Sequence, residues 1–115
     1  MIQPVRRRAL FDDFRRARSG RCGPVRVRVI PDASPDQGQV LVAYALSRRT
    51  GGAVTRNRAR RRLRAVVSEL DRREDGPLPG GSALLFGADA AAAEAPYPEL
   101  CRWVEGALAR AVRPR

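Results

Sequence analysis

Apolar residues recur along the chain at two spacings, one typical of helices and one of strands. Over Arg7–Arg18 they repeat at helical intervals, so we expect a first helix here. Ser19-Gly20 is expected to close it, because glycine commonly follows the last residue of a helix. The core-facing positions would be Leu10, Phe14 and Ala17, with Phe11 nearer the edge of the apolar stripe.

Residues Val25–Ile30 alternate strictly between apolar and basic side chains, which predicts a half-buried strand. Its valines would face the core, and Arg26 and Arg28 would share the wet face. After a Pro31–Gly38 loop, Gln39–Ser47 predicts a second, more apolar strand that could pair with the first as a hairpin. A further short strand beside the first stays open as an alternative.

The second half of the chain predicts two helices and one strand. A polar turn at residues 48–52 precedes a helix over Val54–Arg73, which the Pro- and Gly-rich stretch Glu74–Gly81 ends. Ser82–Gly87 predicts a short third strand, Ala88–Ala95 a loop, and Pro96–Val112 a last helix. The order α-β-β(-β)-α-β-α predicts an α+β fold, a small α/β sandwich forming a single domain over residues 1–115.

The second predicted helix separates apolar from basic positions. At 100° per residue, one stripe collects the apolar side chains Ala59, Leu63, Val66, Val67 and Leu70. The opposite side collects Asn57, Arg61, Arg64 and Ser68, flanked by Arg58 and Arg60. Arg62 falls close to the apolar stripe, so we expect its stem to lie along the edge of the core.

The charge of the chain is concentrated in two blocks. The 115 residues carry 23 basic and 12 acidic side chains, a net charge of +11, and every basic residue is arginine. Residues 1–30 hold nine arginines and two aspartates, and residues 47–73 hold ten arginines and two acids. Such segregation, with a pI near 11.6, favours a polyanionic partner.

Several classes of function are disfavoured by what the sequence lacks. There is no histidine, which removes imidazole bases and the usual histidine-containing zinc sites, so we predict no catalytic residue and no metal site. The two cysteines, Cys22 and Cys101, match no metal-ligand spacing and read as reduced thiols. No segment has the apolar length of a membrane span or the form of a secretory signal, and we expect a cytoplasmic protein.

Six arginines within residues 56–64, with no acid among them, repel one another on a helix. The ordinary interpretation of charges on a helix is a solvated face. An acid-free cluster opposite a clean apolar stripe instead favours phosphate binding, because guanidinium groups bind phosphate oxygens in a two-pronged way. The cluster also begins in a first helical turn, where free backbone N–H groups favour anions.

The string from Ser47 to Arg64, SRRTGGAVTRNRARRRLR, resembles the bacterial ribonuclease P protein component. In that family a strand ends in Ser and two basic residues, followed by a Gly-containing loop, Ala-Val, an Arg-Asn-Arg motif and a basic helix. The order of the other elements is similar along the whole chain. The resemblance implies an α/β sandwich with a left-handed β-α-β crossover, of the kind found in a ribosomal protein domain.

The resemblance also implies partners and roles. The catalytic RNA subunit would cleave precursor tRNA with Mg²⁺ bound through the RNA, and this chain would be the protein component of that endoribonuclease. Two groups of residues would bind RNA. The catalytic RNA would contact Arg56, Asn57, Arg58, Arg60, Arg61, Arg62 and Arg64, together with Ser47, Arg48 and Arg49. The single-stranded 5′ leader of precursor tRNA would lie in a cleft formed by Phe11, Phe14, Arg26 and Arg28.

For Phe11 and Phe14, ordinary core packing is an equal alternative, with Phe14 the better candidate for the core. Two other functions stay open for the chain as a whole. A ribosomal-type structural RNA-binding protein would be equally basic, and the Ser47–Arg64 string argues against it. A DNA-binding protein is disfavoured because the basic helix has neither zipper heptads nor a helix-turn-helix spacing.

Overall fold

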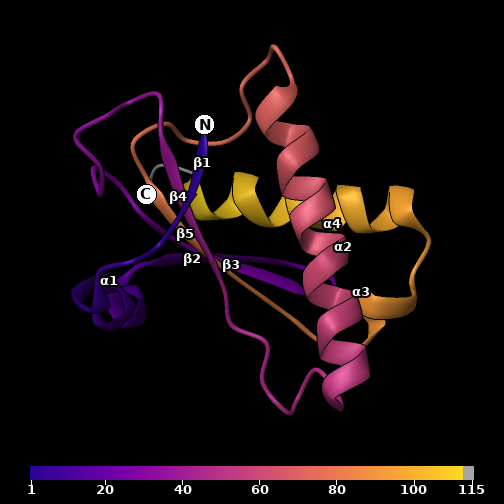
Figure 1. Ribbon diagram of the computed structural model, residues 1–115. Helices are drawn as coiled ribbons and strands as arrows, with labels where there is room; N and C mark the ends of the chain where they lie inside the picture. Colours follow the sequence, from indigo (N-terminus) through magenta and orange to yellow (C-terminus); the bar gives the residue numbers. More distant parts are fainter. Residues whose placement is uncertain (113–115) are drawn as a thin grey trace.

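The computed structural model describes residues 1–112 and contains a single five-stranded sheet with helices on both faces (Figure 1). The strands are β1 (Ile2–Pro4), β2 (Arg18–Cys22), β3 (Val25–Ile30), β4 (Val40–Tyr44) and β5 (Ala83–Ala88). The helices are α1 (Arg8–Asp13), the 3-10 turn η1 (Phe14–Arg16), α2 (Ala53–Arg72), α3 (Ala91–Glu94) and α4 (Tyr97–Val112). The predicted α+β class is confirmed.

The strands are arranged in the order β1-β4-β5-β3-β2. β4 pairs in parallel with both β1 and β5, whereas β3 pairs antiparallel with β5 and β2. The expected β3–β4 hairpin is therefore wrong. β5 lies between those two strands because it is apolar on both faces, with five of its six residues buried, and only a central position covers both.

The two faces of the sheet are covered unequally. α2 and α4 lie on one face and form the main core with the inward residues of β3, β4 and β5. α1 covers only part of the other face, where Leu10 and Phe14 pack against Ala33 and Ala83 in a second, smaller core. The rest of that face is left open, and we call it the open face.

The first helix is shorter than expected, and the residues after it form a strand. α1 and η1 end at Arg16, and Ser19-Gly20, expected to close a helix, lies inside β2. Gly20 is required there for a different reason: a Cβ at this position would stand 2.1 Å from the Ala107 carbonyl oxygen of α4. Contact with α4 therefore overrides the local turn signal, and β2 is the further strand left open by the sequence.

Two more elements differ from the prediction. β1 was not foreseen, because three residues ending in Pro4 give no periodicity; proline is acceptable there because β1 lies at the sheet edge. Ala91–Glu94, expected to be loop, is the short helix α3. The β4-α2-β5 connection supplies the expected β-α-β unit, and its handedness stays a prediction.

Candidate nucleic-acid interface

α2 separates its apolar and basic sides as the sequence predicts. Its five predicted apolar positions are all buried in the main core. The opposite row of Asn57, Arg61, Arg64 and Ser68 is exposed. Its first three residues, together with Arg60, line a hollow on this side of the helix. Within residues 1–112, neither Arg61 nor Arg64 forms a hydrogen bond or ion pair, so both offer free donors.

The arginines that flank this row have partners in the fold. Arg58 forms an ion pair with Glu94 of α3 at 2.8 Å, and Arg60 donates to the Asn57 side chain at 3.0 Å. Arg62 lies at the edge of the core, as predicted, and donates to two backbone carbonyl oxygens at α3, those of Ala92 (2.8 Å) and Ala95. Its guanidinium is therefore occupied in holding α3 against α2.

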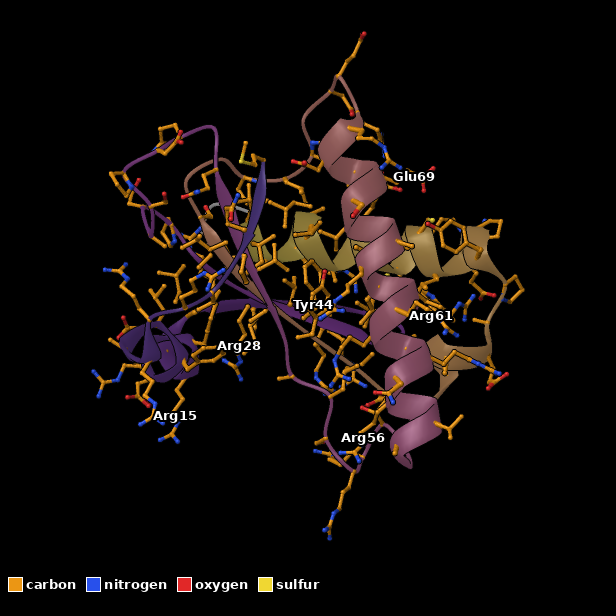
Figure 2. The ribbon with its side chains drawn as sticks, viewed as in Figure 1. Arg15, Arg28, Tyr44, Arg56, Arg61 and Glu69 are labelled. Atoms are coloured by element: carbon orange, nitrogen blue, oxygen red, sulfur yellow. The ribbon has the colours of Figure 1, made fainter. Side chains whose placement is uncertain are left out.

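The start of α2 places further basic groups beside the same face. Arg48 and Arg49 are exposed in the turn before the helix, and Ser47 accepts the Arg49 backbone N–H at 3.2 Å. The buried Thr50 hydroxyl attaches this turn to the end of β5 by donating to the Ala88 carbonyl oxygen at 2.6 Å. Arg56 lies in the first turn, where its Nε is buried with no hydrogen-bond partner among the described residues (Figure 2).

Arginines also line a hollow of about 500 Å³ on the open face of the sheet. Arg26 and Arg28 point to this face, as the alternation in β3 predicts, and Arg21 of β2 lies beside them in register with Arg26. Asp89 binds two of the three, at 2.7 Å from Arg21 and 3.0 Å from Arg26. Arg28 donates to the Phe14 carbonyl oxygen at 3.4 Å, which connects the hollow to η1.

The two predicted aromatic residues of the leader cleft differ in accessibility. Phe14 is 1% exposed and belongs to the second core, whereas Phe11 is 45% exposed. Their ring centroids lie 6.2 Å apart in an edge-to-face arrangement. Neither lines the arginine hollow itself. The structure thus brings Arg26 and Arg28 together, leaves Phe11 as the accessible ring nearby, and favours the core alternative for Phe14.

Sequence reasoning missed three residues of these surfaces. Arg21 and Asp89 were missed because β2 was taken for a helix end and the stretch after β5 for a loop. Tyr44 of β4 was missed although it is the only aromatic residue in an otherwise aliphatic strand, a signal that could have marked it. It lies between the sheet and α2, stacked on Phe86 with the ring centroids 6.0 Å apart.

Tyr44 joins the sheet to the basic side of α2. The Arg64 guanidinium carbon lies over its ring, 5.6 Å from the centroid, a cation–π arrangement. Burial raises the pKa of the Tyr44 phenol to about 12, and the nearby Arg64 charge acts in the opposite direction. The phenol is therefore protonated, and its hydroxyl can donate a hydrogen bond, at any physiological pH.

Clusters of metal-ligating side chains and membrane-spanning helices are both absent from residues 1–112. In residues 1–112, no three Cys, Asp or Glu side chains converge as a metal site would require. No helix in the same range has the length and apolar character needed to cross a bilayer. What the two surfaces do present is guanidinium groups, which bind anions.

Comparison with known proteins identifies the family. The family model described as Ribonuclease P matches residues 3–112. A ribonuclease P protein component from Thermobifida fusca is 38% identical over 124 residues, covering 100% of this chain and 82% of the relative. The chain belongs to the ribonuclease P protein family.

Solved structures show the same fold in this family. The ribonuclease P protein of Staphylococcus aureus superposes with a TM-score of 0.72 at 16% identity, covering 96% of this chain and 97% of that one. That of Thermotoga maritima gives 0.62 at 20% identity, covering 89% and 91%. The family match and the Thermobifida fusca relative make the chain the protein component of the ribonuclease P endoribonuclease, a ribonucleoprotein of tRNA processing, and its partner is ribonuclease P RNA.

Proposed function

We propose that this chain binds the ribonuclease P RNA through the outer face of α2 and holds the 5′ leader of precursor tRNA at the open face of the sheet. The observation that supports RNA binding by α2 is its exposed row, in which Arg61 and Arg64 have no acidic partner among residues 1–112. Bringing unpaired guanidinium groups together is unfavourable in the free protein, and RNA phosphates would neutralise them.

The start of α2 supports the same assignment. The buried Arg56 Nε lacks a hydrogen-bond partner in the described chain, and buried polar groups are rarely left unpaired in native proteins. Arg48 and Arg49 are exposed in the turn before it, and the first helical turn supplies free backbone N–H groups. An RNA phosphate at this end of α2 would bind the exposed Arg48 and Arg49 side chains and the free backbone N–H groups together.

The open face suits a single strand better than a duplex. Single-stranded nucleic acid is held by a positive groove that follows the backbone and by aromatic side chains on which bases stack. The arginine hollow supplies the positive groove, and Phe11, half exposed and edge-to-face with Phe14, supplies an aromatic ring. Phe14 would support the cleft from beneath, since the Arg28 side chain bonds to its backbone.

In this proposal the protein binds and the RNA cleaves. Mg²⁺ would be bound through the RNA, because the described side chains offer no cluster of metal ligands. The protein would reduce phosphate repulsion between the catalytic RNA and its substrate.

Reconstitution tests the proposal. The purified chain is mixed with a bacterial ribonuclease P RNA, and cleavage of a precursor tRNA is followed over a range of Mg²⁺ and salt concentrations. We expect the chain to lower the Mg²⁺ requirement, and to do so more for a substrate with a 5′ leader than for one with the leader shortened to a single nucleotide. Absence of any stimulation would contradict the proposal, and equal stimulation of both substrates would remove the leader from it.

A further inference from the structure

A second recess lies along α2 on the side of the sheet edge, next to the row that is proposed to bind RNA phosphates. It is a groove of about 420 Å³ between β1, β4 and α2, which we call the β1–α2 groove. Its size is in the range of small-ligand sites. The residues that matter here are the apolar wall Ile2, Pro4 and Val5, the Tyr44 ring, and the polar side chains Arg64 and Ser68.

The groove combines three features that suit a planar, polar-edged ring. Its wall on β1 is apolar, and Pro4 brings no backbone N–H to the sheet edge. The Arg64 guanidinium, a flat cation, is held over the Tyr44 ring at 5.6 Å and is exposed to solvent. The Tyr44 and Ser68 hydroxyls have no hydrogen-bond partner in residues 1–112.

The groove is continuous with the phosphate-binding row. Arg60 and Arg64 line both the groove and the hollow that Asn57 and Arg61 complete. A nucleotide whose phosphate lies on Arg61 would therefore have its base within reach of the groove. Proteins recognise unpaired RNA bases by this combination: stacking on aromatic rings or guanidinium planes, with hydrogen bonds to the base edge.

We propose that the β1–α2 groove binds one unstacked nucleobase of the RNA partner, with the Arg64 guanidinium as its stacking surface and Tyr44 as the residue that positions Arg64. This inference rests on the proposed function, because the base belongs to the RNA that the α2 row binds. The Ser68 hydroxyl bonds to the base edge, and the β1 wall excludes water from the other side of the base.

Exchanging arginine for lysine tests the stacking role, since lysine keeps the charge and loses the plane. The affinity of the full-length chain for a bacterial ribonuclease P RNA is measured against salt for Arg64→Lys and Arg61→Lys. The second variant measures the ordinary cost of the exchange on a phosphate-binding row. We expect Arg64→Lys to bind roughly 5-fold or more weakly than Arg61→Lys, given the known contribution of base stacking, with the same salt dependence.

Tyr44 is tested by a pair of variants and a control. Tyr44→Leu keeps apolar volume and loses the ring that positions Arg64, so we expect a loss similar to that of Arg64→Lys. Tyr44→Phe keeps the ring and should recover most of the affinity, which a role limited to the hydroxyl would not allow. Tyr97→Leu, on α4 and away from the groove, should bind like the wild type, and thermal unfolding checks that each variant is folded.

The outcomes separate this inference from the function on which it rests. A wild-type chain that does not bind the RNA overturns both. Wild-type binding with equal losses in Arg64→Lys and Arg61→Lys shows that Arg64 acts only as a charge, and overturns this inference alone. A folded Tyr44→Leu variant with wild-type affinity overturns it as well.

Discussion

The two arginine-rich surfaces of this protein differ in what holds their charges. On the outer face of α2, Arg61 and Arg64 form no ion pair within the described chain. On the open face of the sheet, Arg21 and Arg26 share Asp89, and Arg28 is bonded to a backbone carbonyl oxygen. The first surface presents its full charge to solvent, and the second presents side chains fixed in place with part of their charge neutralised.

This difference predicts that the two surfaces bind different forms of RNA. A free row of cations contributes long-range attraction and strong salt dependence, which suits a large folded RNA. Arginines held by an acid lose less conformational freedom on binding, at the cost of competing with that acid, which suits a weakly bound, passing single strand.

The largest effect is expected from removing the free charges on α2. The double variant Arg61→Ala/Arg64→Ala should bind ribonuclease P RNA at least about 100-fold more weakly, since each charged hydrogen bond contributes roughly 1.5–3 kcal/mol. The slope of log affinity against log salt should become shallower by about 1.5, because each lost phosphate contact removes roughly 0.7–0.9 from that slope. A filter-binding titration at several salt concentrations measures both.

The matched control is Arg72→Ala/Arg102→Ala, which removes the same charge from exposed positions outside the row. An equal loss in this control would mean that net charge, and not the row, determines binding.

The next largest effect is expected from replacing Arg62, and it concerns the free energy of unfolding. Its neighbour Arg61 has no partner in the part of the chain that the structure describes, whereas Arg62 bonds to the carbonyl oxygens of Ala92 and Ala95. Arg62→Ala should lower the free energy of unfolding by about 1–3 kcal/mol because these carbonyls lose their partner, and Arg61→Ala should change it by less than about 0.5 kcal/mol. Urea denaturation followed by circular dichroism measures both values; similar values for the two would show that the Arg62 contacts do not stabilise the fold.

Releasing the open-face arginines should have a smaller effect. Asp89→Asn removes the acid that binds Arg21 and Arg26, so affinity for a short single-stranded RNA should rise by about two- to fivefold at low salt. This rise in affinity is small because an exposed ion pair contributes only roughly 0–1 kcal/mol. Fluorescence anisotropy with a labelled oligonucleotide measures it.

Glu94→Gln on α3 is the counterpart, because it frees Arg58 of α2. It should leave affinity for the oligonucleotide unchanged. A fall in affinity for Asp89→Asn would mean that positioning of the two arginines matters more than their charge.

The smallest effect concerns alkaline pH. The pKa values of Tyr44 and Tyr97, the two tyrosines of the chain, are both raised to about 12, from an ordinary value near 10. Burial is the first cause in each case, and a hydrogen bond to Glu69 adds to it for Tyr97. The unfolded chain releases these protons first, so their contribution to stability is complete below about pH 10 and is lost as the pH rises toward 12.

In a Tyr97→Phe background, the ultraviolet titration of the folded protein should report Tyr44 alone. Ionisation at the ordinary pKa of tyrosine would show that Tyr44 is not buried between β4 and α2. Adding Tyr44→Phe should remove the remaining tyrosine contribution to the alkaline loss of stability.

The amphipathic elements could be predicted because their evidence is local. The α2 stripe and row, and the alternation that sends Arg26 and Arg28 to one face of β3, follow from helix and strand periodicity within single segments. The same reasoning placed Arg62 at the edge of the core. The family resemblance likewise depended on one continuous string of residues.

The elements that were missed depend on contacts between distant segments. β2 is a strand because Gly20 lets it approach α4, almost 90 residues later in the chain. β3 and β4 are separated by β5, which follows both in sequence. Asp89 pairs with Arg21, 68 residues away in the sequence, and no local pattern predicts such a pair.

By itself, then, the sequence determined that this protein would present a row of arginines opposite a buried stripe, because both lie on one helix with fixed geometry. Only the tertiary structure decided which arginines would be free. Arg58 and Arg62 are bonded to α3, Arg21 and Arg26 to Asp89, and Arg64 is placed over Tyr44, while Arg61 has no partner in the described chain. The physical reason is that the charge of a side chain is fixed by its chemistry, whereas its partners depend on how distant segments pack.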